Sequence, residues 1–164
     1  MNKFFLHVGL PKTGSTFLQK EFFPQLSSIL GYKWFKDIGY HSEIRRHIAK
    51  LNFDLDINKL DIRQKTFISD EGLTGFDPNK WDNYAKKNKK AFGADTTILI
   101  IIRDPVQWLN SVYNQISLSE GELIEPKNFF LKKNLYNKSG YNNKFSVDDF
   151  SYDDLINVYK KYFK

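Results

Sequence analysis

The feature that most constrains the fold is the pattern of the first twenty residues, where an apolar segment, a glycine loop and a helix start follow one another. Residues 4–8 are mostly apolar and predict a buried strand. Gly9 and Gly14 bound a loop, and a helical pattern begins near Ser15. Glycines let a backbone approach an anion closely, and the amide groups and positive end of the next helix attract negative charge. The segment therefore predicts a site for a phosphate or sulfate ester.

The loop is close to a Walker A loop, G-x-x-x-x-G-K-[ST], but its lysine is elsewhere. Gly9 and Gly14 have the required spacing. Ser15 occupies the position of the Walker lysine, and the loop lysine is Lys12. We therefore expect no Mg²⁺ site of the ATPase kind, and we expect Lys12 to face the bridging oxygen of the ligand. The alternative is a chance glycine turn before a helix.

Size and composition predict one folded domain, residues 1–164, because hydrophobic residues make up 41% and aromatic residues 16% of a chain without an obvious linker. The net charge of +6 suits an anionic partner, although the lysine clusters are equally typical of solvated helix faces. The absence of cysteine excludes disulfides, thiolate metal sites and a cysteine nucleophile. The longest apolar run, Ile98–Ile102, is far too short to span a membrane, and no cleavable signal is evident. We expect a soluble, cytoplasmic protein.

Strands and helices are expected to alternate along the chain. Thr66–Ser69 forms a short β-prone run, and residues 96–102 read as a central strand that is apolar on both faces. A helix is expected between these strands, from near Pro78 with Asp77 as its cap to Gly93. This order predicts an α/β fold with three layers and a mostly parallel sheet, in which ligands bind beyond the carboxyl ends of the strands.

Other segments have weaker patterns. The first helix is expected to bend or stop at Pro24, and residues 32–35 form either a strand or an aromatic lid. Residues 42–51 suggest a helix, and the polar residues 120–145 suggest a surface excursion that contacts the acceptor. Ser151 with Asp154 resembles the capping box of a closing helix through Phe163.

A second phosphate site is expected after the strand that ends near Arg103. A helix should follow as far as about Leu118, which puts Ser111 two turns into it. A guanidinium at a strand end and a hydroxyl two turns along the helix can converge on one phosphate. The inner face of this helix is expected to contain Val106, Leu109, Val112, Tyr113 and Ile116.

These two segments together resemble the sulfotransferases that use 3′-phosphoadenosine 5′-phosphosulfate. The run from Pro11 to Thr16 is similar to their 5′-phosphosulfate loop, and the Arg103–Ser111 pair to their 3′-phosphate signature. The resemblance implies a phosphate-binding loop like a P-loop, with 3′,5′-adenosine bisphosphate as product and a hydroxyl or amine acceptor, such as a glycan. Its cofactor-binding residues would be Lys12, Thr13, Gly14, Ser15, Thr16, Arg103 and Ser111.

The resemblance also suggests a catalytic base. Ser69-Asp70-Glu71 is similar to the Ser-x-Glu segment of glycan-type and many bacterial members, so Glu71 is the expected base, with Asp70 as the alternative; both are otherwise ordinary turn acids. Lys12 would then act with Glu71 in catalysis. His7 is expected to pack in the core, and His41 and His47 do not share a helix face, so no metal site is expected.

Domains of this family are usually longer and continue into another strand and loop that hold the nucleotide. The implied pocket would then be completed by a second subunit, as in a homo-oligomer, or be incomplete. The expected partners are the nucleotide and a small-molecule or glycan acceptor, with no nucleic acid. Two alternatives are a catalytically inactive nucleotide-binding relic and a P-loop small-molecule kinase.

Overall fold

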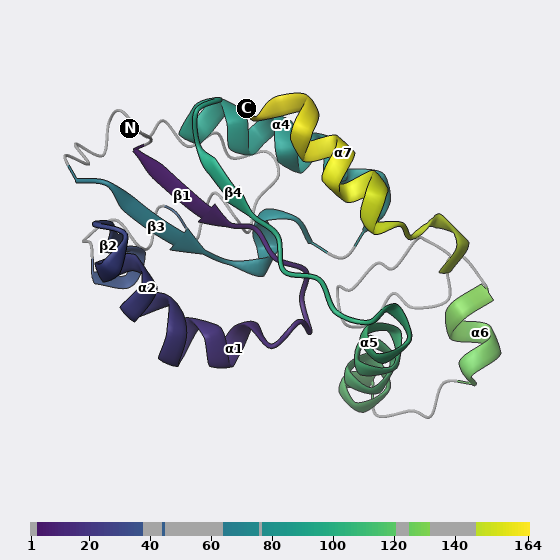
Figure 1. Ribbon diagram of the computed structural model, residues 1–164. Coiled ribbons are helices and arrows are strands. Elements are labelled where there is room, and N and C mark those ends of the chain that lie inside the picture. Colours follow the sequence, from purple (N-terminus) through teal and green to yellow (C-terminus); the bar gives the residue numbers. More distant parts are fainter. Residues whose placement is uncertain (1–2, 38–43, 45–63, 76, 121–124, 132–146) are drawn as a thin grey trace.

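The computed structural model describes residues 3–37, 44, 64–75, 77–120, 125–131 and 147–164 (Figure 1). The expected helix at residues 42–51, His41 and His47 lie almost wholly outside this part of the chain. Within it, one parallel sheet of four strands has the order β2-β3-β1-β4. The strands are β1 Phe4–His7, β2 Lys33–Trp34, β3 Thr66–Ser69 and β4 Thr97–Leu99. The fold is therefore α/β.

Helices lie on both faces of the sheet (Figure 1). The described α-helices are α1 Ser15–Phe17 with its continuation α2 Phe23–Ile29, α4 Trp81–Phe92, α5 Pro105–Glu120, α6 Pro126–Leu131 and α7 Tyr152–Tyr162. Figure 1 shows α1 and α2 against one face, and α4 with α7 against the other. The core between them is rich in aromatic side chains, among which Phe67 and Trp81 are almost fully buried.

Local signals place several helix ends where the sequence predicts them. The carboxylate of Asp77 accepts a hydrogen bond from the amide of Asn79 at the turn that leads into α4, and Gly93 ends α4 with a φ of 87°. Ser151 caps α7 by accepting a hydrogen bond from the amide of Asp154. These predictions are confirmed. They could be made from the sequence because each depends on groups only a few residues apart.

The helix after the glycine loop does not stop at Pro24. Residues Leu18–Phe22 form a π-helical turn that the amide of Phe23 closes onto the carbonyl of Leu18. Pro24 then occupies the first turn of α2, where a missing amide hydrogen costs no helical hydrogen bond. Residues 32–35 form β2 and the start of a 3₁₀ turn, so the strand alternative holds.

Two expectations about burial are wrong. Within the described sheet, β4 is an edge strand, its residues are only half-buried, and its pairing ends at Leu99 instead of Ile102. The interior strands are β1 and β3, because the chain crosses from β3 over β1 to reach β4. On α5, Val106 is 66% exposed, whereas Trp108 is fully buried beside Val112. The apolar run of residues 98–102 therefore does not form a central strand here.

Candidate functional site

The strand order brings three loops together at one edge of the sheet. β1 lies between β3 and β4, and all three strands are parallel. The segment that follows the carboxyl end of each strand contains a predicted site residue. The reversal of strand order at β1 is where open α/β sheets commonly form a ligand crevice. The candidate site is therefore built from the residues that follow β1, β3 and β4.

The segment after β1, residues 8–14, is here called the glycine loop. Its backbone turns through left-handed conformations at Lys12, with φ of 68°, and at Gly14, with φ of 88°. A lysine rarely adopts a positive φ, and residues held in this way concentrate at ligand-binding sites. Inside the loop, the Thr13 hydroxyl donates a 2.7 Å hydrogen bond to the carbonyl of Leu10.

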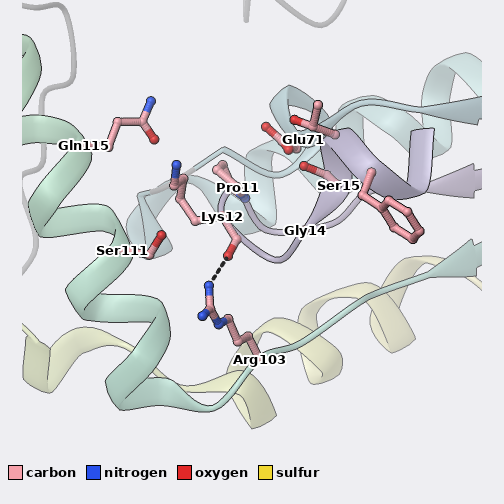
Figure 2. A pocket seen from close by; sticks show the side chains of 10 residues that line it. Pro11, Lys12, Gly14, Ser15, Glu71, Arg103, Ser111 and Gln115 are labelled. Atoms are coloured by element: carbon pink, nitrogen blue, oxygen red, sulfur yellow. Dashed lines mark hydrogen bonds between the residues drawn. The ribbon is translucent and has the colours of Figure 1, made fainter. Parts of the chain in front are cut away.

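A pocket of about 500 Å³ opens between the glycine loop, the turn after β3 and α5. Figure 2 shows Ser111 and Gln115 on one side of it, Glu71 and Ser15 on the other, and Lys12 between them. The residues that line the pocket are Pro11, Lys12, Gly14, Ser15, Thr16, Phe17, Glu71, Arg103, Ser111 and Gln115. Two cationic side chains, one carboxylate and several hydroxyl groups thus face one space.

Arg103 follows the strand end and reaches back to the glycine loop. Its guanidinium donates a 3.4 Å hydrogen bond to the carbonyl of Lys12 (Figure 2). It also donates to the side-chain carbonyl of Gln107, at 3.2 Å. Its own carbonyl accepts a 2.6 Å hydrogen bond from the Tyr152 hydroxyl. The guanidinium is exposed, so its remaining N–H groups can bind an anion in the pocket.

The two acidic residues after β3 have different positions. Asp70 accepts a 2.9 Å hydrogen bond from the amide of Gly72 and caps the turn Glu71–Leu73. Glu71 lines the pocket. Burial raises the pKa of Glu71 above its ordinary value and the neighbouring Asp70 raises it further, while Lys12 opposes the rise. A carboxylate with a raised pKa is a stronger base than an ordinary one.

The structure brings most of the predicted site residues to this pocket. Lys12, Gly14, Ser15, Thr16, Glu71, Arg103 and Ser111 all line it. Thr13 is not among the lining residues, and its hydroxyl bonds within the loop to the carbonyl of Leu10. His7 is fully buried, as expected for a core histidine.

Sequence reasoning missed three residues that line the pocket: Pro11, Phe17 and Gln115. Gln115 was detectable, because it is four residues after Ser111 and residues at that spacing share a helix face. Phe17 reads as a core residue by helical periodicity, yet 66% of it is exposed. Its exposure depends on how the first helix packs, which no local pattern reports.

Two features are absent from the described part of the chain. Among the described residues, no group of three or more histidine, aspartate or glutamate side chains is placed to hold a metal ion. No described helix is both long enough and apolar enough to cross a membrane. Comparisons with protein-family models, with curated proteins and with solved structures found no match to this chain.

Proposed function

We propose that the protein is a sulfotransferase that moves a sulfuryl group from 3′-phosphoadenosine 5′-phosphosulfate to a hydroxyl or amine acceptor, possible acceptors including glycans. The single observation that supports this most is that Lys12, Arg103 and Glu71, from three different strand ends, line one pocket. The two cations can each bind one anionic end of the nucleotide, and the carboxylate can remove a proton from the acceptor. In this proposal the glycine loop is a phosphate-binding loop similar to a P-loop.

The donor would lie with its phosphosulfate at the glycine loop and its 3′-phosphate between Arg103 and Ser111. Lys12, with the loop amides and the hydroxyls of Ser15 and Thr16, would stabilise the charge that develops on the departing phosphate oxygen. The bond between sulfur and that oxygen breaks while a bond from sulfur to the acceptor atom forms. The product 3′,5′-adenosine bisphosphate then leaves.

Glu71 would take the acceptor's proton. It lines the pocket together with Lys12, and the charge of Lys12 acts on its pKa, so the base and the cation are close. Asp70 is less suitable because its carboxylate caps the following turn. We therefore keep Glu71 as the base and Asp70 as the alternative to be tested.

Two other functions remain to be tested against this one. A P-loop small-molecule kinase would need a Mg²⁺ site, and Ser15 stands in place of the Walker lysine. An inactive nucleotide-binding relic would keep the pocket and bind the nucleotide without turnover. The presence of Glu71 beside Lys12 in the pocket fits the sulfotransferase proposal, since nucleotide binding alone does not require a carboxylate there.

The first experiment compares ligands by thermal unfolding. A ligand that binds only the native protein raises the melting temperature. We expect 3′,5′-adenosine bisphosphate to raise it and ATP with Mg²⁺ to raise it less; the reverse order would support the kinase and contradict our proposal.

The second experiment measures transfer of labelled sulfate from the donor to a panel of sugars, phenols and amines. Transfer to any member of the panel, lost in Lys12→Ala, is the expected result. Nucleotide binding without transfer to any acceptor class would favour the relic.

A further inference from the structure

His7 is a buried histidine that the proposed reaction does not use. It is the last residue of β1, immediately before the glycine loop, and its side chain is 0% exposed. Its Nδ1 lies 2.8 Å from the hydroxyl of Ser69, at the carboxyl end of β3. The imidazole also packs against the ring of Phe23, with the centroids 4.8 Å apart. The ring is therefore held between two strand ends and the first helix.

The contacts of Gln19 indicate which nitrogen of His7 carries the proton. The Gln19 amide nitrogen lies 3.4 Å from the carbonyl of Ser69, which can only accept, so this group is the donor. The same nitrogen donates to the Ser69 hydroxyl at 3.1 Å. The hydroxyl hydrogen remains available, and we assign it to Nδ1 of His7, which would accept it at 2.8 Å.

In this arrangement the hydrogen of the neutral ring is on Nε2. Burial lowers the pKa of His7 to about 4, so the ring is neutral near pH 7. Among the described residues, Nε2 has no hydrogen-bond partner. A buried N–H without a partner is unusual and costs free energy, so it calls for a reason.

The Nε2 edge of the ring faces the start of the glycine loop. A methyl group added to Gly9 would lie 2.7 Å from both Cε1 and Nε2 of His7, closer than real contacts allow. Gly9 also has a φ of 31°, which a side chain would strain. The backbone of the loop thus passes directly over the imidazole, at a distance that only glycine permits.

We infer that His7 is a positioning residue for the glycine loop: the chain from Gln19 through Ser69 fixes the imidazole in its Nε2–H form, and the ring sets where the backbone turns at Gly9. It acts through the loop and does not line the pocket itself. The inference rests on the proposed function only where it concerns nucleotide binding, because the residues that would bind the nucleotide follow Gly9 directly.

The test uses a double-mutant cycle of His7→Asn and Gly9→Ala. Asparagine can keep a polar group near the Nδ1 position but is too short to reach Gly9. We expect His7→Asn to weaken binding of 3′,5′-adenosine bisphosphate by about tenfold or more, since small displacements of a binding loop have large effects. Gly9→Ala should weaken nucleotide binding more in the wild-type background than in the His7→Asn background, because the shorter asparagine leaves room for the added methyl group.

A matched control separates loop position from loss of stability. Thr96→Val removes another buried hydroxyl, which donates to the carbonyl of Phe92 far along the sequence from the loop. It should lower the melting temperature without changing nucleotide affinity. Additive effects of the two loop mutations, or unchanged affinity in His7→Asn, would overturn the inference.

A second measurement does not depend on nucleotide binding. The ¹⁵N shifts of the imidazole should show the Nε2–H form in the wild-type protein. Ser69→Ala should change which ring nitrogen is protonated, although Gly9 itself is not substituted. The amide resonances of Gly9, Lys12 and Gly14 should move in Ser69→Ala but not in Thr96→Val. An Nδ1–H ring, or unmoved loop amides, contradicts the inference even if the wild type binds no nucleotide; failure of wild-type binding alone contradicts only the proposed function.

Discussion

The indole Nε1 of Trp108 donates a 2.7 Å hydrogen bond to the carbonyl oxygen of Pro11. This bond ties the first turns of α5 to the glycine loop across 97 residues of sequence. Trp108 is fully buried and stacks on Phe150, with ring centroids 4.4 Å apart. The loop that contains Lys12 is therefore supported by a rigid, buried side chain.

Trp108→Phe should lower stability and weaken nucleotide binding, because it leaves the Pro11 carbonyl without this donor. An unpaired buried acceptor costs about 1–3 kcal/mol in addition to the lost packing. The matched control is Trp81→Phe, since Trp81 is equally buried but its Nε1 has no hydrogen-bond partner among the described residues. Urea unfolding should show the larger loss for Trp108→Phe, and only this variant should lose nucleotide affinity. Equal losses in both properties would contradict a special role for the bond.

Replacing Lys12 separates its charge from its backbone strain. Both Lys12→Ala and Lys12→Gly lose the ammonium group, so each should slow sulfate transfer by about 10²- to 10³-fold. Their stabilities should differ, because the φ of 68° strains alanine by about 1 kcal/mol but suits glycine. Transfer rates and thermal unfolding check the two effects, with exposed Lys160→Ala on α7 as the charge-matched control. Normal transfer by Lys12→Gly would remove Lys12 from the mechanism.

The pH dependence of transfer should report the ionisation of Glu71. A base must be deprotonated, so activity should rise with pH and reach half its plateau above the ordinary pKa of 4.5, because burial and Asp70 raise the pKa of Glu71. Asp70→Asn keeps an oxygen to cap Gly72 but removes the negative charge, so it should move the midpoint to lower pH. If Asp70→Asn instead abolished transfer while Glu71→Gln did not, Asp70 would be the base.

The same pKa shift predicts the sign of a stability difference. A carboxyl whose pKa is raised by folding stabilises the folded state in its protonated form, so this contribution is full below pH 4.5 and is lost as pH rises through the raised pKa. Glu71→Gln cannot ionise and should therefore be more stable than wild type at neutral pH. The difference should shrink as the pH falls toward 4.5. Urea unfolding across this range is the measurement, and a less stable Glu71→Gln at neutral pH would contradict it.

The hydroxyl of Tyr159 joins α7 to the end of the turn after β3. It lies 2.8 Å from the Thr74 hydroxyl and donates to the carbonyl of Leu73 at 3.2 Å, in a fully buried position. Tyr159→Phe should cost about 1–3 kcal/mol in unfolding free energy. Tyr162→Phe, on the same helix, loses a hydroxyl that bonds to half-exposed Asp82 and should cost less. A greater loss in Tyr162→Phe would show that burial does not determine the cost.

The parts of the fold that could be predicted are those with short-range causes. The Asp77 cap, the end of α4 at Gly93 and the Ser151 cap each depend on groups within four residues. The edge position of β4 was predicted wrongly, because a run of isoleucines has the same pattern whether or not another element covers it. On α5 the burial of Val112 is confirmed, but Val106 is exposed. Trp108 was missed because its partner Pro11 is not near it in sequence.

The sequence by itself determined the ingredients of the site: a strand that ends in a glycine loop with one lysine, acidic residues after a second strand, and an arginine and a serine eight residues apart after a third. Only the tertiary structure decided that β1 lies between β3 and β4, and hence that Glu71 and Arg103 share a pocket with Lys12. Turns and caps follow from steric and hydrogen-bond preferences over a few residues. Strand order follows from how the whole chain buries its apolar surface, which no single segment encodes.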